Sequence, residues 1–330
     1  MSRKLITIST IMTLMSTSVI ADVPNVAADI APIHSLVSRV MDGVGAPKLI
    51  VQSGASPHGY RLRPSEAKAL QDADHVFWMG EELTPWLDSA IGTLASKASV
   101  TTLLDQQGVI LHDFREGALF EAHDHSAHGD DDHDDHDDHD DHDDHKDHDD
   151  HDDHDDHDDH SSHDPHAWLS PENAKLWLNI IASKLSVSDP ENAATYFMNA
   201  AAGQAEIEAM IAEVKATLKP VQGGKFVVFH DAYQYFENDF DFYASGAISL
   251  GDSSDPSPAR IEKVQKRIRD EGIQCVLAEP QFKKGLVATV MEGSDATASV
   301  IDPLGAELET GPKLYTRLIK NMAKTLRNCL

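Results

Sequence analysis

Residues 188–220 read SDPENAATYFMNAAAGQAEIEAMIAEVKATLKP, and the organisation of the whole chain follows from this stretch. The Ser-Asp-Pro-Glu run at its beginning favours the start of a helix, and only Gly203 weakens the helix before Pro220 ends it. At 1.5 Å per residue such a helix is roughly 45 Å long, enough to run the length of a domain. The stretch therefore predicts one long, rigid helix that joins two halves of the chain.

On both sides of this helix, short apolar stretches alternate with amphipathic ones. This alternation is typical of α/β units with mainly parallel sheets. The predicted strands are residues 23–28, 48–51, 75–79, 100–103, 225–229, 243–248, 274–278 and 299–301. The predicted helices are residues 33–41, 64–71, 84–94, 171–185, 231–238, 258–270, 284–291 and 312–329. We expect an N-terminal α/β domain over residues 22–188, the linker helix over 189–220 and a C-terminal α/β domain over 221–330.

The N-terminus has the pattern of a secretory signal peptide. Arg3 and Lys4 precede a moderately apolar run, Leu5 to Ile20, and Ala21 provides a small residue for cleavage. The run is short and diluted by Ser and Thr, which disfavours the alternative of a membrane anchor. Residues 1–21 are therefore predicted to be removed on export, and no later stretch is long and apolar enough to span a bilayer.

A histidine and aspartate tract interrupts the first half. Its ten histidines recur every third residue, nearly always separated by Asp-Asp: His133, His136, His139, His142, His145, His148, His151, His154, His157 and His160. Imidazole nitrogen and carboxylate oxygen are both metal ligands, and so polar a segment cannot form a packed core. The tract predicts a disordered, metal-collecting loop within residues 122–164. The alternative, a solvated acidic spacer, leaves the histidines unexplained.

The tract also accounts for most of the net charge. Residues 122–165 contain 22 Asp and one Lys, a net charge of −21, so the remaining residues contribute only −8 of the total of −29. The sequence thus has no basic patch for nucleic acid or for an anionic membrane surface. Its negative field attracts cations instead.

The chain has two cysteines, Cys275 and Cys329. An even number in an exported chain favours a disulfide, which here would tie the C-terminal helix to a predicted strand. A thiolate metal site is the alternative, but no CxxC spacing supports it.

Four potential ligands lie near the ends of predicted elements. His58 follows a strand of the first half, His166 precedes a helix, and His230 and Asp302 close strands of the second half. Ligands bind outside the carboxyl ends of strands in open α/β sheets, so these positions suit a binding site. Three imidazoles and one carboxylate form a tetrahedral site suited to Zn²⁺.

The other isolated histidines, His34, His75 and His112, are interpreted as structural or surface residues. Three histidines with an open fourth position also occur in zinc hydrolases. The sequence has no HExxH motif to supply a general base, which disfavours an enzyme.

Five motifs resemble the periplasmic zinc-binding components of bacterial zinc ABC importers, a group of substrate-binding proteins. In order along the mature chain, they are GASPHGY-x-LRPS from Gly54, DPHAWLSP from Asp164, FHDAY from Phe229, AEPQF from Ala278 and DPLG from Asp302. A His/Asp-rich insertion is also typical of the group. The resemblance implies two (β/α) domains joined by one long helix, with metal in the cleft between them.

The resemblance carries over His58, His166 and His230 as zinc ligands. The fourth position stays open between Asp302 and water, since Pro57 stands where some zinc-binding members have glutamate. Glu279 is a candidate to orient a ligand histidine, or else an ordinary carboxylate at a strand end. Related manganese binders generally have glutamate where this chain has His230, and imidazole there favours zinc.

The resemblance also implies a function and a partner. We expect a periplasmic monomer that captures Zn²⁺ as transported cargo and delivers it to a membrane permease. The alternatives are a zinc buffer or chaperone that meets no transporter, and the hydrolase considered above.

Overall fold

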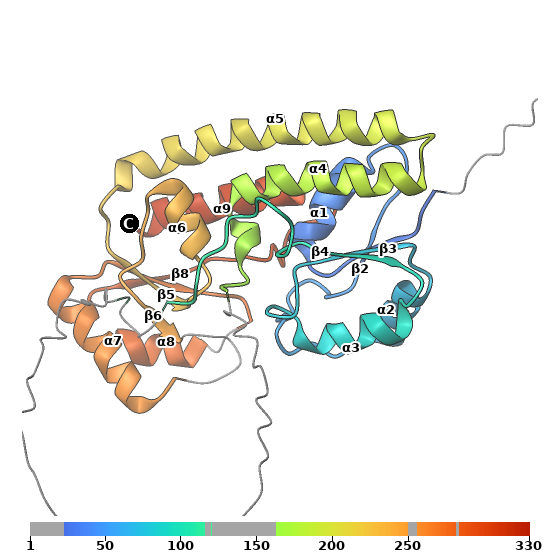
Figure 1. The fold of residues 1–330 in the computed structure, drawn as a ribbon. Helices are drawn as coiled ribbons and strands as arrows, with labels where there is room; N and C mark the ends of the chain where they lie inside the picture. The colour runs from blue at the N-terminus through green and yellow to red at the C-terminus, as the bar shows by residue number, and fades with distance from the viewer. Residues whose placement is uncertain (1–22, 116–119, 121–162, 250–255, 282–283) are drawn as a thin grey trace, which may run out of the picture.

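The structure is a computed structural model that describes residues 23–115, 120, 163–249, 256–281 and 284–330. The predicted signal peptide and the ten-histidine tract lie outside these residues. Within them, two four-stranded sheets lie side by side beneath a layer of long helices (Figure 1).

The first sheet has the order β2-β1-β3-β4, with every neighbouring pair parallel. Its strands are β1 (Val26–Ala28), β2 (Lys48–Leu49), β3 (His75–Trp78) and β4 (Ser99–Thr102). Its helices are α1 (Ala31–Val40), α2 (Pro64–Gln71) and α3 (Pro85–Leu94). Helices α2 and α3 cover one face of the sheet, where Ala27, Val76 and Trp78 point into a separate apolar cluster.

The second sheet repeats this arrangement with the order β6-β5-β7-β8, again all parallel. Its strands are β5 (Phe226–His230), β6 (Ala247–Ser249), β7 (Cys275–Ala278) and β8 (Thr297–Val300). Its helices are α6 (Gln234–Phe240), α7 (Pro258–Glu271), α8 (Lys284–Met291) and α9 (Leu314–Cys329). Helices α7 and α8 cover the outer face of this sheet.

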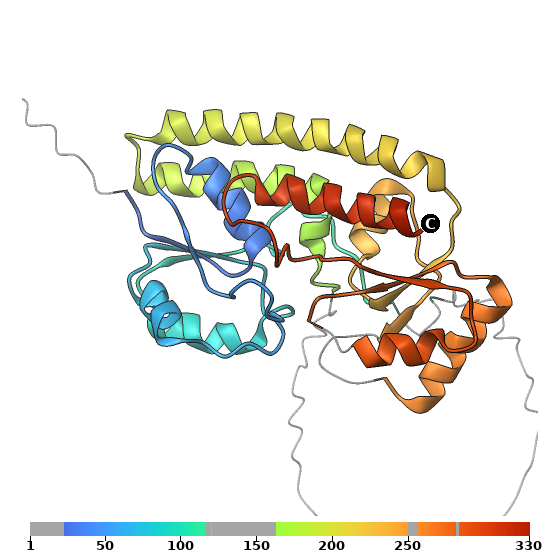
Figure 2. The same cartoon turned by 180° about the vertical axis from the view of Figure 1, so that it is seen from behind.

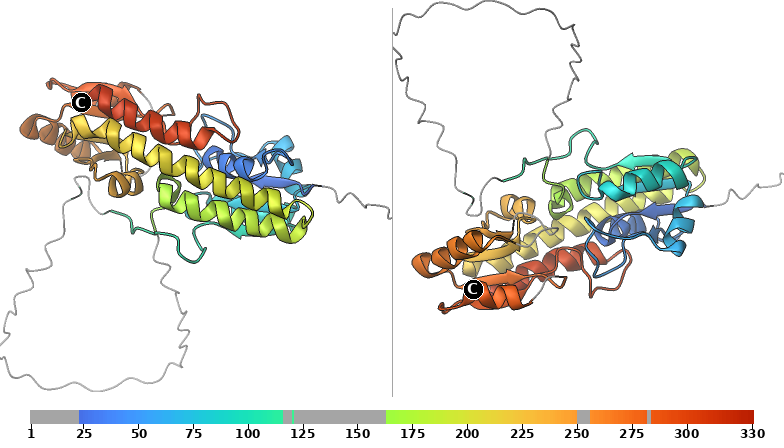
Figure 3. Two further views of the ribbon diagram at one scale, coloured as in Figure 1. Left: turned by 90° about the horizontal axis from the view of Figure 1, so that it is seen from above. Right: turned by 90° about the horizontal axis from the view of Figure 1, so that it is seen from below.

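Two antiparallel helices connect the halves. Helix α4 (Pro171–Ser188) follows the short 3₁₀ helix η1 (Ala167–Leu169), and the long helix α5 (Ala193–Leu218) returns to the second half, where the 3₁₀ turn η2 (Lys219–Val221) ends it. Seen from above, α5 lies between α4 and α9 (Figure 3). From behind, α9 runs beneath α5 toward α1 of the first half (Figure 2).

One apolar core extends through both halves. It contains Val26 and Phe77 of the first sheet, Val228 and Leu277 of the second, and the inner faces of α1, α4, α5 and α9. The long helix is therefore one member of a packed helical layer, and the two halves share a core rather than hinging on a single element. This arrangement restricts large domain closure.

The long helix starts later than the sequence predicts. The prediction placed its start at Ser188 to Glu191, whereas α5 begins at Ala193. Asp189 is fully buried and accepts hydrogen bonds from Asn192 and from the hydroxyl of Tyr196. These bonds hold residues 189–192 in a tight turn between α4 and α5, so the helix starts only after the turn is complete.

A disulfide between Cys275 and Cys329 confirms the predicted pairing, with a Cα–Cα distance of 5.6 Å. It links β7 to the last turn of α9, so the C-terminal helix is covalently held against the second sheet.

Candidate metal site

Adjacent strands of the second sheet bring three of the predicted site residues to one edge. His230 is the last residue of β5, Glu279 directly follows β7, and Asp302 lies two residues beyond β8. Because these parallel strands are neighbours in the order β5-β7-β8, their carboxyl ends lie together at one edge of the sheet. His230 and Glu279 are buried, with 3% and 2% of their surfaces exposed.

His230 is held by a carboxylate. Its Nδ1 lies 2.5 Å from Oε1 of Glu279, and the other oxygen of Glu279 accepts a 2.7 Å hydrogen bond from the amide of Gln281. Since an ionised carboxylate can only accept, Nδ1 carries the proton and Nε2 presents a lone pair. Glu279 therefore has the orienting contact that the sequence reasoning proposed for it.

His166 is held in the same way by a residue close to it in sequence. Oδ1 of Asp164 accepts hydrogen bonds from both the backbone N–H of His166, at 3.0 Å, and its ring Nδ1, at 2.6 Å. The ring lies against Trp168, whose indole N–H donates to the carbonyl of Pro303 in the second half. The ring is thus fixed with its Nε2 directed away from Asp164.

The two Nε2 atoms of His166 and His230 face one another at 3.4 Å. Two nitrogens bound to one tetrahedral Zn²⁺ at 2.0–2.1 Å are separated by about 3.3 Å. The pair therefore already has the spacing that a tetrahedral zinc ion requires, and each ring has its other nitrogen hydrogen-bonded to a carboxylate. This is the usual arrangement of histidine ligands to zinc.

His58 comes from the other side of the site, on the loop that follows β2. It is half-buried, and the centre of its ring lies 5.6 Å from that of His166. The indole of Trp86 donates a 2.7 Å hydrogen bond to the carbonyl of Pro57 and so ties this loop to α3. A small hollow between the halves is lined by all three histidines, Trp168 and Glu279.

Among the residues that the structure describes, no three His, Cys, Asp or Glu side chains form a closed metal-binding group.

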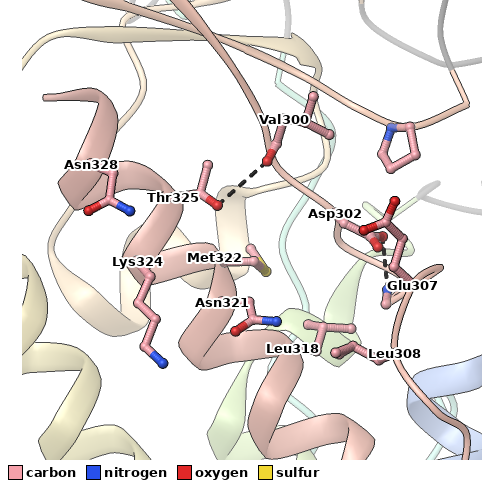
Figure 4. Close-up of a pocket in the computed structure, with 12 residues that line it drawn as sticks. Val300, Asp302, Glu307, Leu308, Leu318, Asn321, Met322, Lys324, Thr325 and Asn328 are labelled. Atoms are coloured by element: carbon pink, nitrogen blue, oxygen red, sulfur yellow. Dashed lines mark hydrogen bonds between the residues drawn. The ribbon is translucent and has the colours of Figure 1, made fainter.

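Asp302 does not line the hollow between the histidines, although the next two residues, Pro303 and Leu304, do. Its carboxylate accepts hydrogen bonds from the backbone N–H groups of Leu304, Gly305 and Ala306. Burial raises the pKa of this carboxyl above its ordinary value, while the three N–H groups act in the opposite direction. The side chain lines a larger hollow against α9, together with Glu307, Asn321 and Lys324 (Figure 4).

The remaining isolated histidines have local hydrogen-bond partners. His34 Nε2 contacts the carbonyl of Pro47, His75 Nε2 contacts the hydroxyl of Ser188, and His112 Nε2 contacts the amide of Asn238. Burial lowers the pKa values of His34 and His75, which favours their neutral forms. These contacts agree with the structural roles expected for the three residues.

Sequence reasoning gave no role to Asp164, Gln281 or Trp168. The signal for Asp164 was present, because an aspartate two residues before a candidate ligand can accept from that residue's own N–H. Gln281 acts locally, on the carboxylate of Glu279 two residues before it. Trp168 acts across the chain, on the carbonyl of Pro303 135 residues later, and no local pattern indicates that contact.

Comparison with known proteins identifies the family. A family profile described as "Zinc-uptake complex component A periplasmic" matches residues 26–329. The chain belongs to this family. It is 49% identical over 305 residues to the high-affinity zinc uptake system protein ZnuA of Brucella abortus (strain 2308), covering 92% of this chain and 91% of that protein. It is 45% identical to the ZnuA of Paracoccus denitrificans (strain Pd 1222), covering 94% and 93%.

Solved structures support the same fold. A crystal structure of ZnuA superposes with a TM-score of 0.70 at 20% identity, covering 93% of this chain and 99% of that one. A substrate-binding protein of Pseudomonas aeruginosa, FpvC in complex with Mn²⁺, superposes with a TM-score of 0.69 at 17% identity, covering 93% and 97%. No helix in the described part of this family member is long and apolar enough to cross a membrane.

Proposed function

We propose that the chain captures Zn²⁺ in the periplasm through His58, His166 and His230 and delivers it to the permease of an ABC importer. The 3.4 Å separation of two lone-pair nitrogens, each backed by a carboxylate, is the observation that supports this best. Three neutral imidazoles favour zinc over Mg²⁺ or Ca²⁺, which prefer oxygen ligands. Membership of the zinc-uptake family and the similarity to ZnuA proteins support the same function.

For the fourth position we favour water over Asp302. Coordination by Asp302 competes with the three N–H groups that its carboxylate already accepts, and Asp302 does not line the hollow between the histidines. An Asp302→Ala variant is expected to retain tight zinc binding. A loss comparable to that of a histidine variant would identify Asp302 as the fourth ligand.

The His/Asp tract is proposed to be an accessory collector that raises the local concentration of Zn²⁺. Deleting residues 122–160 is expected to leave one tight site and to lower the total zinc bound per chain. A tenfold loss of affinity at the remaining site would show instead that the tract contributes to the main site.

Growth experiments separate uptake from buffering. Cells that lack the protein are expected to grow poorly when zinc is scarce, and added zinc is expected to restore growth through low-affinity routes. The His166→Ala variant should fail to complement at low zinc, while a matched His75→Ala variant should complement. If excess zinc does not restore growth, the uptake function is wrong.

A further inference from the structure

We propose that Arg115 is a positioning residue of the zinc site, which fastens both buried histidine ligands into one frame that spans the two halves. The inference rests on the proposed zinc site, because the role of Arg115 is to keep His166 and His230 at the observed spacing.

The chain first crosses between the halves before the His/Asp tract. Residues 110–115, here called the crossing segment, leave the first half and reach α6 of the second. Asn173 of α4 holds the beginning of the segment, since its amide both accepts from the N–H of Ile110, at 2.8 Å, and donates to its carbonyl, at 3.0 Å. The crossing segment is thus anchored at its start by the helical layer.

The crossing segment then pairs with the chain that leads into His166. The N–H of Asp164 donates to the carbonyl of His112, and Asp113 forms an antiparallel bridge with His163. The hydroxyl of Tyr235 in α6 joins the two, because it accepts from the N–H of His112 and donates to the carbonyl of Asp164. Since Asp164 also holds the ring of His166, the position of that ligand depends on this pairing.

Arg115 ends the crossing segment and attaches it to the residue that follows the other ligand. Its guanidinium donates from Nε to both oxygens of Asp231 at 3.0 Å, with a further contact from Nη2, and from Nη1 to Glu237 at 2.5 Å. The exposed fractions of the three side chains are 16%, 6% and 1%. Asp231 directly follows His230, so the ion pair holds the end of β5.

Removing this cation would leave two buried carboxylates side by side without their counter-ion. Breaking a buried ion pair in this way is strongly unfavourable, and like charges in a low-dielectric site repel. The chain can relieve the repulsion by moving Asp231, and His230 moves with it. The distance between the two Nε2 atoms then no longer matches a tetrahedral ion.

The test compares Arg115→Gln with Arg39→Gln in the mature chain. Arg39 forms the matched control, a two-bond pair with Glu206 that links α1 to α5 and lies away from the zinc site. Competitive zinc titration should show the tight phase about tenfold or more weaker in Arg115→Gln, as for other residues that orient zinc ligands. Arg39→Gln should stay within about twofold of wild type. Equal, unchanged affinities in both variants would overturn the proposal.

Two further measurements distinguish this role from general stability and from failure of the zinc site itself. Arg115→Lys keeps the positive charge but not the planar guanidinium with its several donors. It is expected to bind zinc more tightly than Arg115→Gln but less tightly than wild type. If Arg115→Gln does not fold, wild-type affinity in Arg115→Lys overturns the proposal. In zinc-free protein, Arg115→Gln should speed amide hydrogen exchange at residues 229–231, and unchanged exchange there contradicts the role of Arg115. If the wild-type protein shows no tight zinc-binding phase but Arg115→Gln does change hydrogen exchange at residues 229–231, the proposed zinc site is wrong. The structural role of Arg115 in holding the end of β5 would still be supported.

Discussion

The two halves have the same strand order, but the residues at the carboxyl ends of the corresponding strands β1 and β5 make different contacts. In the first half, Asp29 directly follows β1, and its carboxylate accepts from the N–H groups of Ile30 and Met79, both at 2.7 Å. In the second half, His230 ends β5 and reaches the carboxylate of Glu279 beyond β7. Both contacts tie the central strand to the neighbour on the same side, β3 or β7.

The difference explains why the site is asymmetric. Both carboxylate oxygens of Asp29 accept hydrogen bonds from backbone N–H groups of the first half, so neither oxygen is directed at a ligand. His230 uses only one ring nitrogen for the contact with Glu279, and the other remains directed at His166. In the proposed site the first half therefore contributes His58 from a loop, whereas the second contributes His230 from a strand end. One strand end stabilises the fold, and the other is proposed to bind metal.

Changing the metal-binding strand end should have the largest effect. We expect His230→Ala to weaken tight zinc binding about a thousandfold, or about 4 kcal/mol, since structural zinc sites with four ligands contribute about 10–16 kcal/mol in all. Stability without zinc should change little by comparison. Competitive titration and thermal unfolding with and without zinc measure the two effects. Tight binding by the variant would contradict the assignment of His230.

Substituting Asp29, at the end of β1, should have the opposite effect: a loss of stability with little change in zinc affinity. Asp29→Ala leaves two buried N–H groups without acceptors, which is expected to cost about 3 kcal/mol of unfolding free energy. Zinc affinity should stay within about threefold of wild type, measured on folded protein at low temperature. A large loss of affinity with little loss of stability would break the comparison between the halves.

The pH dependence gives this prediction a sign. Burial raises the pKa of Asp29 to about 7, above its value of 3.8 in the unfolded chain. Because the pKa is higher in the folded chain, the contribution of Asp29 to the free energy of unfolding is complete below pH 3.8. It is lost as the pH rises through 7. The stability difference between wild type and Asp29→Ala should therefore be smaller at pH 8 than at pH 6, as measured by denaturant unfolding.

The carboxylate behind His230 should have an intermediate effect. Glu279→Gln keeps a hydrogen-bond acceptor for the ring but removes the charge, so we expect zinc to bind about tenfold more weakly. Glu307→Gln is the matched control, because Glu307 lines the neighbouring hollow outside the histidine group. Equal affinities for the two variants would show that Glu279 does not orient the ligand.

The helix shared by both halves should show the smallest effect. In α5, a Cβ on Gly203 would lie 2.9 Å from Cδ1 of Leu178 and 3.1 Å from Cγ of Arg39, so Gly203→Ala is expected to destabilise by about 1 kcal/mol despite its better helix propensity. Gly92→Ala in α3 meets no atom within 4 Å and should stabilise slightly. Denaturant unfolding of both variants measures the difference. Stabilisation by both would mean that α5 is not tightly packed at Gly203.

Local signals allowed much of the fold to be predicted. Pro64 and Pro258 mark helix starts at the residues where α2 and α7 begin, and β3 and β7 match apolar runs. Contacts distant in sequence displaced other boundaries. Asp231 was expected to start a helix, but its carboxylate binds Arg115, 116 residues earlier, and α6 begins at Gln234.

The candidate site shows the same division. Its histidines stand at element ends that the sequence indicates, and the structure brings His58, His166 and His230 around one hollow. The contacts that orient these histidines could be predicted only in part from the sequence. Glu279 was proposed from its motif, whereas the bond from Trp168 to Pro303 and the ion pairs of Arg115 join segments more than 100 residues apart.

The most direct test of the central claim is competitive zinc titration of a chain that lacks residues 122–160, with and without the His166→Ala change. Removing the tract excludes its ten histidines from the measurement. The account predicts a tight one-to-one step in the parent chain that disappears in the variant. A tight step that survives the His166→Ala change would contradict zinc binding between His166 and His230.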